Sequence, residues 1–301
     1  MCYLKIFNLL KTNILFIINP ISGGKKKSKI PRMIDVYLDK SKFNANFSFT
    51  EYVGHAAELA EEAAKKNFDI IVAVGGDGTI NEVAAKVMQY QKILGIIPQG
   101  SGNGLARFLK IPMDIKKAIQ LINAYNVETI DCAKLNGKFF FNMAGMGFDA
   151  HISAAFANDK TRGLQGYVKM IVKEISSYQP QTYQIEIDGV SYTRDAFVIS
   201  IANSSQYGNN VFISPASSTT DGLLDVCIIK KFPLYKIPVL VYQMLRAKTH
   251  RSTMVEIIRG KHIVINRNKE DAIHLDGESF FMDKEIIIEV LPLALNIITN
   301  N

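Results

Sequence analysis

The sequence predicts an α/β protein of two domains, in which a domain built on a parallel sheet precedes a β-rich domain. In the first ~130 residues, apolar strand-like segments alternate with helix-patterned segments, which is typical of a parallel sheet covered on both faces. After Asp131 the chain changes to short segments rich in β-branched and aromatic residues, which predict strands. Glycine-rich loops follow several strands of the first half. We therefore place the domain boundary near residues 130–137.

Composition limits the classes of partner. The 301 residues are 48% hydrophobic and 21% charged, as in a folded globular protein. A net charge of +7 favours anionic partners such as nucleotides or phospholipid surfaces. No zinc-finger, RNP-like or helix-turn-helix pattern occurs, so we expect no nucleic-acid partner.

Cellular location follows from the cysteines and from the apolar runs. Cys2, Cys132 and Cys227 match no metal spacing, so we expect reduced, mostly buried thiols and a cytoplasmic protein. No apolar run reaches ~18 residues, and polar residues interrupt the N-terminal apolar stretch, so we expect no membrane span and no signal peptide.

The first half is expected to contain four strands and their covering helices. The strands are runs of Ile, Val, Leu and Phe, and the helices carry an apolar face. The expected strands are residues 14–18, 43–52, 70–74 and 93–97, and the expected helices are 31–39, 56–66, one capped by Thr79, one that begins at Leu105 and runs through Lys110, and 114–124.

The second half is expected to contain seven strands and two helices. The dipeptide Asp188-Gly189 separates two of the strands and is a strong signal for a two-residue hairpin turn. The expected strands are residues 138–143, 183–188, 191–202, 223–230, 255–259, 262–266 and 285–291, and the helices are 166–177 and 234–248.

The segment Gly75-Gly76-Asp77-Gly78-Thr79 is the strongest functional signal. It joins an apolar strand to a helix-patterned run, so main-chain N–H groups and the helix dipole would be free to bind phosphate. Thr79 and Glu82 match a capping box, which predicts that the helix begins after Thr79. The alternative is a tight strand-to-helix turn, as in any α/β protein.

Two further loops of this kind follow neighbouring strands. One is Pro98–Gly104, and the other is Asn19–Gly24, which leads into the lysine run Lys25–Lys29. Ligands of open α/β sheets bind outside the carboxyl ends of the strands, so the three loops together indicate a polyphosphate site. The lysine run would serve that site, or it would be a solvated helix lead-in or a membrane-surface contact.

Two acidic clusters are candidates for metal binding or proton transfer. They are Asp221–Asp225 and Asp276–Glu278, and each contains Asp-Gly, which is also a common turn dipeptide. Glu278 follows alternating apolar residues, so we expect a half-buried carboxylate whose raised pKa suits proton abstraction from a hydroxyl. The five histidines show no metal-ligand spacing, and no Walker A or protein-kinase motif is present.

Five motifs occur along the chain. They are Asn19-Pro20-x-Ser22-Gly23, GGDGTIN at 75–81, Pro98-x-Gly100-Ser101-Gly102-Asn103, NMAGMGFD at 142–149, and Asp276-Gly277-Glu278. Their order resembles that of the diacylglycerol kinase catalytic-domain family, which includes bacterial lipid kinases, sphingosine kinases and ceramide kinases. The resemblance covers essentially the whole chain. GGDGT alone is shared with NAD kinases, whereas the set of five is far more specific.

The resemblance implies an ATP-dependent, Mg²⁺-requiring transfer of the γ-phosphate to a lipid hydroxyl. The site would lie in the cleft between a Rossmann-like, NAD-kinase-like α/β domain (1–132, completed by 289–301) and a β-sandwich domain for the lipid (133–288). Glu278 would be the general base, and Asp276 would orient or polarise it. Mg²⁺ would be held by Asp221 and by backbone carbonyls near Ser218 and Leu223, and a separate catalytic Mg²⁺ would arrive with ATP. The nucleotide would contact Asn19, Ser22, Thr50, Gly75, Gly76, Asp77, Gly78, Thr79, Ile80, Asn81, Glu82, Gly100 and Ser101.

Alternatives remain for the acceptor and for the activity. Residues 100–107 read GSGNGLAR, which looks closer to sphingosine-type kinases. The sequence therefore does not choose among diacylglycerol, a sphingoid base or ceramide, phosphatidylglycerol and polyprenol as the acceptor. A soluble small-molecule kinase of the NAD-kinase type and a non-catalytic nucleotide- or lipid-binding regulator are the rival functions. The partners expected are a membrane lipid and the membrane surface, reached peripherally, and the oligomeric state stays open, a homodimer included.

Overall fold

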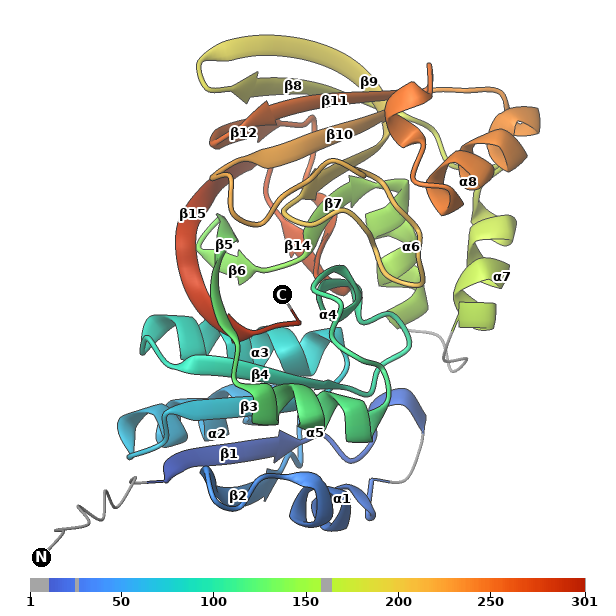
Figure 1. Ribbon diagram of the computed structural model, residues 1–301. Coiled ribbons are helices and arrows are strands. Elements are labelled where there is room, and N and C mark those ends of the chain that lie inside the picture. Colours follow the sequence, from blue (N-terminus) through green and yellow to red (C-terminus); the bar gives the residue numbers. More distant parts are fainter. Residues whose placement is uncertain (1–10, 25–26, 158–163, 301) are drawn as a thin grey trace, which may run out of the picture.

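The computed structural model describes residues 11–24, 27–157 and 164–300. Two domains follow one another along the chain and lie one above the other (Figure 1). Cys2, Lys25 and Lys26 lie outside the described residues, whereas Cys132 and Cys227 are buried free thiols, as predicted.

The first domain is built on a parallel sheet with the strand order β4-β3-β1-β2. Its central strands consist almost entirely of Ile, Val, Leu, Phe and Ala, and β3 is buried along its whole length. Such strands are expected where helices cover both faces of a sheet. The four strands are β1 (Thr12–Ile18), β2 (Phe43–Phe49), β3 (Ile70–Gly75) and β4 (Ile93–Pro98).

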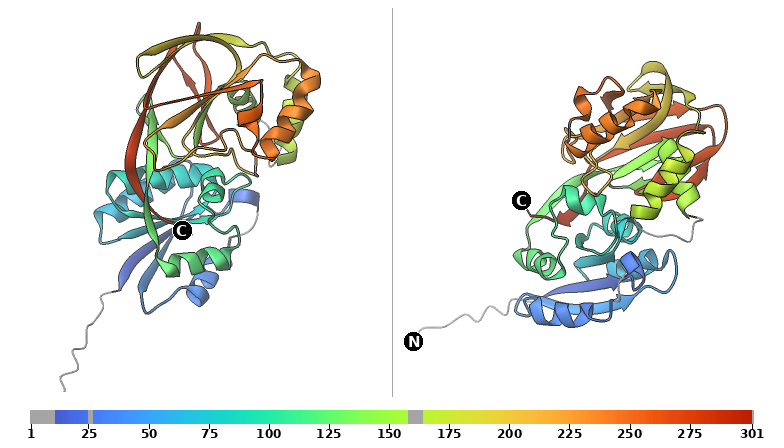
Figure 2. Two further views of the ribbon diagram at one scale, coloured as in Figure 1. Left: turned by 45° about the horizontal axis from the view of Figure 1, so that its top comes forward. Right: turned by 90° about the vertical axis from the view of Figure 1, so that its right-hand side faces the viewer.

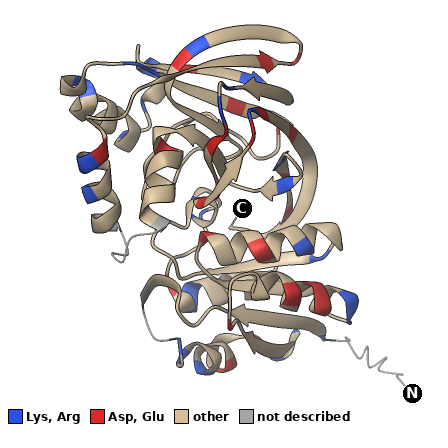
Figure 3. Cartoon of the chain, turned by 180° about the vertical axis from the view of Figure 1, so that it is seen from behind, with Lys and Arg blue, Asp and Glu red and all other residues tan. Residues whose placement is uncertain are grey.

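Helices cover both faces of this sheet. Two of them pack together on the face seen in Figure 1 and two on the face seen in Figure 3. On the first face are α1 (Ile30–Tyr37) and α5 (Ile115–Ala124), and on the second are α2 (His55–Lys65) and α3 (Asp77–Gln89). The short elements η1 (Ser22–Gly24) and α4 (Gly104–Phe108) follow β1 and β4, so they lie at the carboxyl edge of the sheet.

The second domain is a set of mainly antiparallel strands folded into a β-sandwich. The predicted Asp188-Gly189 hairpin is confirmed, with both residues at positive φ (49° and 84°) between β8 and β9. The strands are β5 (Val127–Leu135), β6 (Lys138–Phe140), β7 (Met143–Gly147), β8 (Gln181–Ile187), β9 (Val190–Ala202), β10 (Leu224–Lys230), β11 (Val255–Gly260), β12 (His262–Asn266), β13 (Asp271–Leu275), β14 (Glu278–Met282) and β15 (Glu285–Ile298).

Strand β10 shows how this domain forms two apolar layers. Leu224, Val226 and Ile228 enter the core between the sheets. Cys227 and Ile229 point to the other face, where they join a second core that helices cover. A strand buried on both faces reads as a continuous apolar run, which is why the sequence shows no polar alternation here.

Helices close the second apolar layer. They are α6 (Phe148–Ala157), α7 (Leu164–Glu174) and α8 (Ile237–Leu245), with the short turns η2 (Leu234–Lys236) and η3 (Thr249–Arg251) flanking α8. Helix α6 was not among the predicted helices. The predicted helix 234–248 is divided into η2 and α8 and ends at Leu245, before η3.

The last strand connects the domains. The first part of β15 pairs with β12 in the sandwich, and Asn296–Ile297 pairs in parallel with β4. Strand β5 lies antiparallel to β15 over most of its length, so β5 and β15 cross together between the domains (Figure 2). All strands of the described residues thereby belong to one hydrogen-bonded sheet.

Candidate active site between the domains

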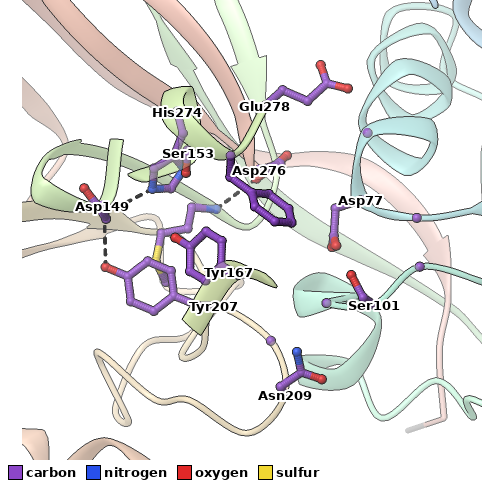
Figure 4. Close-up of a pocket in the computed structure, with 18 of the residues that line it drawn as sticks. Asp77, Ser101, Asp149, Ser153, Tyr167, Tyr207, Asn209, His274, Asp276 and Glu278 are labelled. Carbon is purple, nitrogen blue, oxygen red and sulfur yellow. Dashed lines mark hydrogen bonds and ion pairs between the residues drawn. The ribbon is translucent and has the colours of Figure 1, made fainter. Parts of the chain in front are cut away.

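One large cavity, of about 1170 Å³, joins the glycine loops of the first domain to helices α6, α7 and α8 of the second. Its two ends differ in chemistry. The end at the glycine loops is lined by main chain, hydroxyls, amides and carboxylates, and the end at the helices is lined by Phe, Ile, Val, Leu and Met side chains. Figure 4 shows polar side chains of both domains converging on this cavity.

Two glycine loops touch at the polar end. A Cβ on Gly100 would lie 2.6 Å from the Cα of Gly76, so neither loop can carry a side chain there without moving the other. Gly76 is extended, with φ −93°, and α3 begins at the next residue. The first N–H groups of α3, which have no intrahelical partners, therefore open onto the cavity beside bare main chain. This arrangement suits an anion such as phosphate.

The predicted capping box is wrong. Helix α3 begins at Asp77, not after Thr79, and no side chain caps it. Thr79 lies inside the first turn, where its Oγ1 accepts a hydrogen bond from Asn19 Nδ2 at 2.9 Å. Glu82 does not reach back to its own helix, because its carboxylate accepts the N–H groups of Gly54 and Ala56 at the start of α2, at 3.0 and 3.1 Å. Thr79 and Glu82 therefore connect α3 to two other segments: Thr79 to the loop after β1, and Glu82 to the start of α2.

Asp77 fixes the glycine loop Pro98–Gly104. Its two carboxylate oxygens accept the N–H groups of Asn103 and Gly104, at 2.8 and 2.9 Å, at the beginning of α4. Burial raises the pKa of Asp77 to about 6, although the two backbone donors act in the opposite sense. Asp77 thereby connects the loop Gly75–Thr79 to the loop Pro98–Gly104.

Asn103 was not among the predicted site residues. It is buried with φ 52°, and its amide both accepts from Gly100 N at 3.0 Å and donates to Gly100 O at 2.9 Å. Asparagine is the commonest non-glycine residue in this left-handed region, because its side chain bonds to nearby main chain. Its position within a glycine string was the signal that could have identified it.

The remaining glycine loop, Asn19–Gly24, packs against the other two. Ser22 donates to the main-chain oxygen of Asn19 at 3.1 Å, which closes a turn after β1. Lys27, the first described residue of the lysine run, is buried and donates to Gln99 Oε1 at 3.1 Å. At this position the lysine run therefore stabilises the contact between two loops and is not a solvated lead-in.

Glu278 begins β14 and reaches across the cavity to α3. A Cβ on Gly78 would overlap Glu278 Oε1, so the carboxylate lies directly against the first turn of α3 (Figure 4). Among the described residues its carboxylate has no hydrogen-bond or ion-pair partner. Burial, with the negative charges of Glu82 and Asp276, raises the pKa of Glu278, as expected for a half-buried carboxylate.

Asp276 has a different environment from Glu278. Its oxygens accept the N–H groups of Phe141, Asn142 and Met143, each at 2.9 Å, and the amide of Asn81 on α3 at 2.7 Å. Burial raises its pKa, against the effect of these donors. Asp276 and Gly277 also form the β13–β14 hairpin turn, with φ 49° and 89°. The turn interpretation of this cluster is thus correct, and the same residues also line the cavity.

A second polar group at the middle of the cavity was not predicted. Asp149 Oδ2 lies 3.1 Å from His274 Nε2, and the Tyr207 hydroxyl donates to it at 3.3 Å. Ser200 bonds to the same hydroxyl. His274 is buried, and its Nδ1 has no partner among the described residues. Asp149, His274 and Tyr207 come from α6, β13 and the segment after β9, so sequence spacing gave no signal for this group.

The structure places most of the predicted nucleotide-site residues around the cavity. Gly75, Ile80 and Asn81 lie behind its wall. Gly75 packs against Thr79, Ile80 belongs to the core, and Asn81 bonds to Asp276. The predicted residues that line the cavity are Asn19, Ser22, Thr50, Gly76, Asp77, Gly78, Thr79, Glu82, Gly100, Ser101, Asp276 and Glu278.

The predicted metal residues lie apart from the cavity lining. Ser218, Asp221 and Leu223 belong to the loop before β10, where Asp221 accepts Leu223 N at 3.1 Å and faces Arg259 at 3.5 Å. Buried Asp131 holds this loop by accepting Gly222 N at 2.7 Å. Across residues 11–24, 27–157 and 164–300, no group of three or more His, Cys, Asp or Glu side chains is placed to hold a metal ion. This metal site stays a prediction.

The helices of the described chain are all too short or too polar to cross a membrane.

An α/β domain with glycine-lined loops, facing a β-sandwich domain across a cavity whose far end is apolar, defines the fold of a two-domain kinase. The chain belongs to the diacylglycerol kinase catalytic-domain family of lipid kinases. Residues 13–135 match the diacylglycerol kinase catalytic domain, and residues 142–299 match the YegS C-terminal NAD kinase beta sandwich-like domain.

Relatives match along most of the chain. The "Diacylglycerol kinase" of Bacillus subtilis (strain 168) is 29% identical over 268 residues, which cover 87% of this chain and 88% of the relative. The "Probable lipid kinase YegS" of Escherichia coli O6:K15:H31 (strain 536 / UPEC) is 31% identical over 284 residues, or 91% and 93% of the two chains. A crystal structure of a diacylglycerol kinase from Bacillus anthracis str. Sterne has the same fold, with a TM-score of 0.75 at 23% identity, over 96% of this chain and 97% of that one.

Proposed function

We propose that this lipid kinase transfers the γ-phosphate of ATP to the hydroxyl of a membrane lipid, a diacylglycerol-like or sphingoid acceptor. One observation carries the proposal. The Glu278 carboxylate lies against Gly78 at the start of α3, between the glycine loops and the apolar half of the cavity. A base in that position can meet a hydroxyl that arrives from the apolar side and a phosphate that arrives from the loops.

The polar end fits a triphosphate. Gly76 and Gly100 leave their main chain bare, and the N-terminus of α3 favours negative charge. Asn19, Thr79 and Ser101 line the same end and add side-chain donors. Phosphoryl transfer depends mainly on positioning and charge stabilisation, and these groups would supply both.

Glu278 would accept the proton of the acceptor hydroxyl at one carboxylate oxygen. Its raised pKa makes the carboxylate a stronger base than an exposed glutamate. Asp276 would act through its neighbours: with both oxygens bonded to N–H groups, it would position the β13–β14 turn that carries Glu278.

Mg²⁺ bound with ATP would neutralise the phosphate charge. For the separate site, Ser218, Asp221 and Leu223 offer only oxygen atoms, which is the donor set that Mg²⁺ prefers. Because this loop lies outside the cavity lining, an ion held there would stabilise the fold and would not act on the phosphate.

The apolar half of the cavity favours a lipid over NAD as the acceptor. Phe148, Ile171, Phe197, Leu240 and Met244 line it, and they offer dispersion contacts and few hydrogen bonds. Asp149, His274 and Tyr207 lie between this half and the loops, where the polar part of a lipid would have to rest.

The decisive test is phosphate transfer from labelled ATP across a panel of lipids and NAD, with the wild type and Glu278→Gln. The wild type should phosphorylate at least one lipid and not NAD. Glu278→Gln should lower turnover by about 10²-fold or more, because it removes the base, while ATP affinity measured by calorimetry is kept. An active Glu278→Gln enzyme would assign the base elsewhere, and phosphorylation of NAD alone would overturn the lipid assignment.

A further inference from the structure

The cavity opens to the surface between α7 and α8. Val168 on α7, and Val241 and Leu245 on α8, line the cavity, yet their side chains are 46–52% exposed. Residues that face both a cavity and solvent mark its mouth. The apolar half of the cavity thus has an entrance of its own, formed by other elements than the glycine loops.

Apolar side chains continue outward from this mouth. Val172, Val239 and Tyr242 do not line the cavity, and they are 51–69% exposed. Helix α8 has the sequence IPVLVYQML, with no charged residue, and only Leu240 is buried. A helix in water normally keeps its exposed face polar, so this one is built for a surrounding that is partly apolar.

Basic residues surround the same face. The segment 230–254, which contains α8, carries six Lys and Arg and no Asp or Glu. Lys230 pairs with Glu256, and Lys173 on α7 pairs with Glu174. The other basic side chains are exposed: Lys231, Arg246, Lys248 and Arg251 on the segments flanking α8, and Lys169 on α7. Figure 3 shows these blue segments on α7 and around α8.

We propose that the exposed face of α7 and α8 docks on the surface of an anionic lipid bilayer, so that a lipid enters the cavity directly from the membrane. This docking proposal deepens the proposed function, and it rests on that function for the identity of the lipid that enters the cavity. Apolar side chains such as Val239 and Tyr242 enter the boundary between headgroups and acyl chains, and the lysines and arginines contact anionic headgroups. A bilayer is the occupant that fits, because the apolar face continues without a break into a cavity that leads to Glu278.

The first experiment exploits the absence of tryptophan from the chain. Tyr242→Trp gives the full-length protein a single fluorescent tryptophan on α8. Val36→Trp places the tryptophan on α1 as a matched control, because Val36 is exposed as Tyr242 is. With phosphatidylglycerol vesicles, the emission of Tyr242→Trp should shift to shorter wavelength and that of Val36→Trp should not. With phosphatidylcholine vesicles the shift should be much smaller. No shift for Tyr242→Trp, an equal shift in the control, or equal shifts with both lipids would overturn the proposal.

The second experiment uses the double variant Val239→Glu/Tyr242→Glu, with Val36→Glu as its control. Two carboxylates on the docking face should lower co-sedimentation with phosphatidylglycerol vesicles, and phosphorylation of a long-chain lipid within them, by about tenfold or more. Turnover of a dispersed short-chain acceptor should be unchanged, because neither residue lines the cavity. Unchanged co-sedimentation would overturn the docking surface. Docking through α8 without turnover of any lipid would reject the proposed function and leave the surface standing.

Discussion

Three carboxylates of the cavity differ in their surroundings. Asp77 and Asp276 accept main-chain N–H groups, so both organise loops. Glu278 has no such donors among the described residues, and its carboxylate faces the cavity against Gly78. Local sequence presents all three as acids beside glycines, and only the structure shows that Asp77 and Asp276 accept main-chain N–H groups whereas Glu278, within the described part of the chain, does not.

Asp77→Ala should abolish ATP binding. The change removes the two acceptors that hold Asn103 and Gly104, so the second glycine loop loses its place beside the first. Calorimetric titration with ATP measures the effect. Asp35→Ala, on the exposed surface of α1, is the control and should bind as the wild type does. Unchanged affinity in Asp77→Ala would reject the assignment of this loop to the nucleotide.

The pH dependence of kcat/KM should report the raised pKa of Glu278. A general base works only when ionised, and burial places its pKa above the ordinary glutamate value of 4.5. Activity should therefore fall on acidification, with a midpoint above that value. This loss of activity at acidic pH should be absent from the pH profile of the residual activity of Glu278→Gln. If it persists in that variant, the titrating group is not Glu278.

At the scale of elements, the strands of the first domain and the loops after them were predictable. The apolar runs that became β3 and β4 are fully determined by local pattern, because burial on both faces requires a continuous apolar sequence. The start of α3 was not predictable in the same way. Thr79 and Glu82 have the spacing of a capping box, but their side chains bond to Asn19 and to the start of α2, which a local pattern does not contain.

Gly100→Ala tests the contact between the two glycine loops. The added methyl would lie 2.6 Å from Gly76 Cα and 2.8 Å from Asn103 Oδ1, so the loops must separate. ATP affinity should fall by about tenfold or more, equivalent to losing one hydrogen bond to a charged group.

The matched control is Gly95→Ala within β4, where the methyl would meet Val72 Cγ2 at 2.9 Å. Overpacking there should lower the free energy of unfolding by about 1–3 kcal/mol and leave the ATP affinity of the folded protein unchanged. Equal ATP affinity in both variants would show that the loop contact does not shape the phosphate site.

At the scale of the whole molecule, the domains are joined by β5 and β15 and by side chains that cross the cleft. Asn81 on α3 bonds to Asp276 in the second domain, 195 residues away in sequence, and to Phe139 O at 3.1 Å. These bonds fix the distance between the turn that carries Glu278 and the helix that it faces. The geometry of the candidate active site is thus a property of the domain junction.

Asn81→Ala should destabilise the protein by about 1.5–3 kcal/mol, since it removes a donor from a buried charged acceptor. Urea unfolding measures this change. The surface control Asn44→Ala removes only an exposed hydrogen bond and should change stability by less than about 0.5 kcal/mol. Equal stability of the two variants would mean that Asn81 contributes nothing to the junction.

The sequence by itself determined the α/β and β-rich halves, the three loops after parallel strands and the acids that accompany them. These features follow from local periodicity and from turn chemistry, which neighbouring residues specify. Only the tertiary structure decided that Glu278 faces Gly78, that Asp276 accepts N–H groups from both domains, and that Asp149, His274 and Tyr207 meet. It also decided that α7 and α8 enclose an apolar entrance. These features depend on contacts between segments far apart in the chain, where packing and not spacing sets which side chains meet.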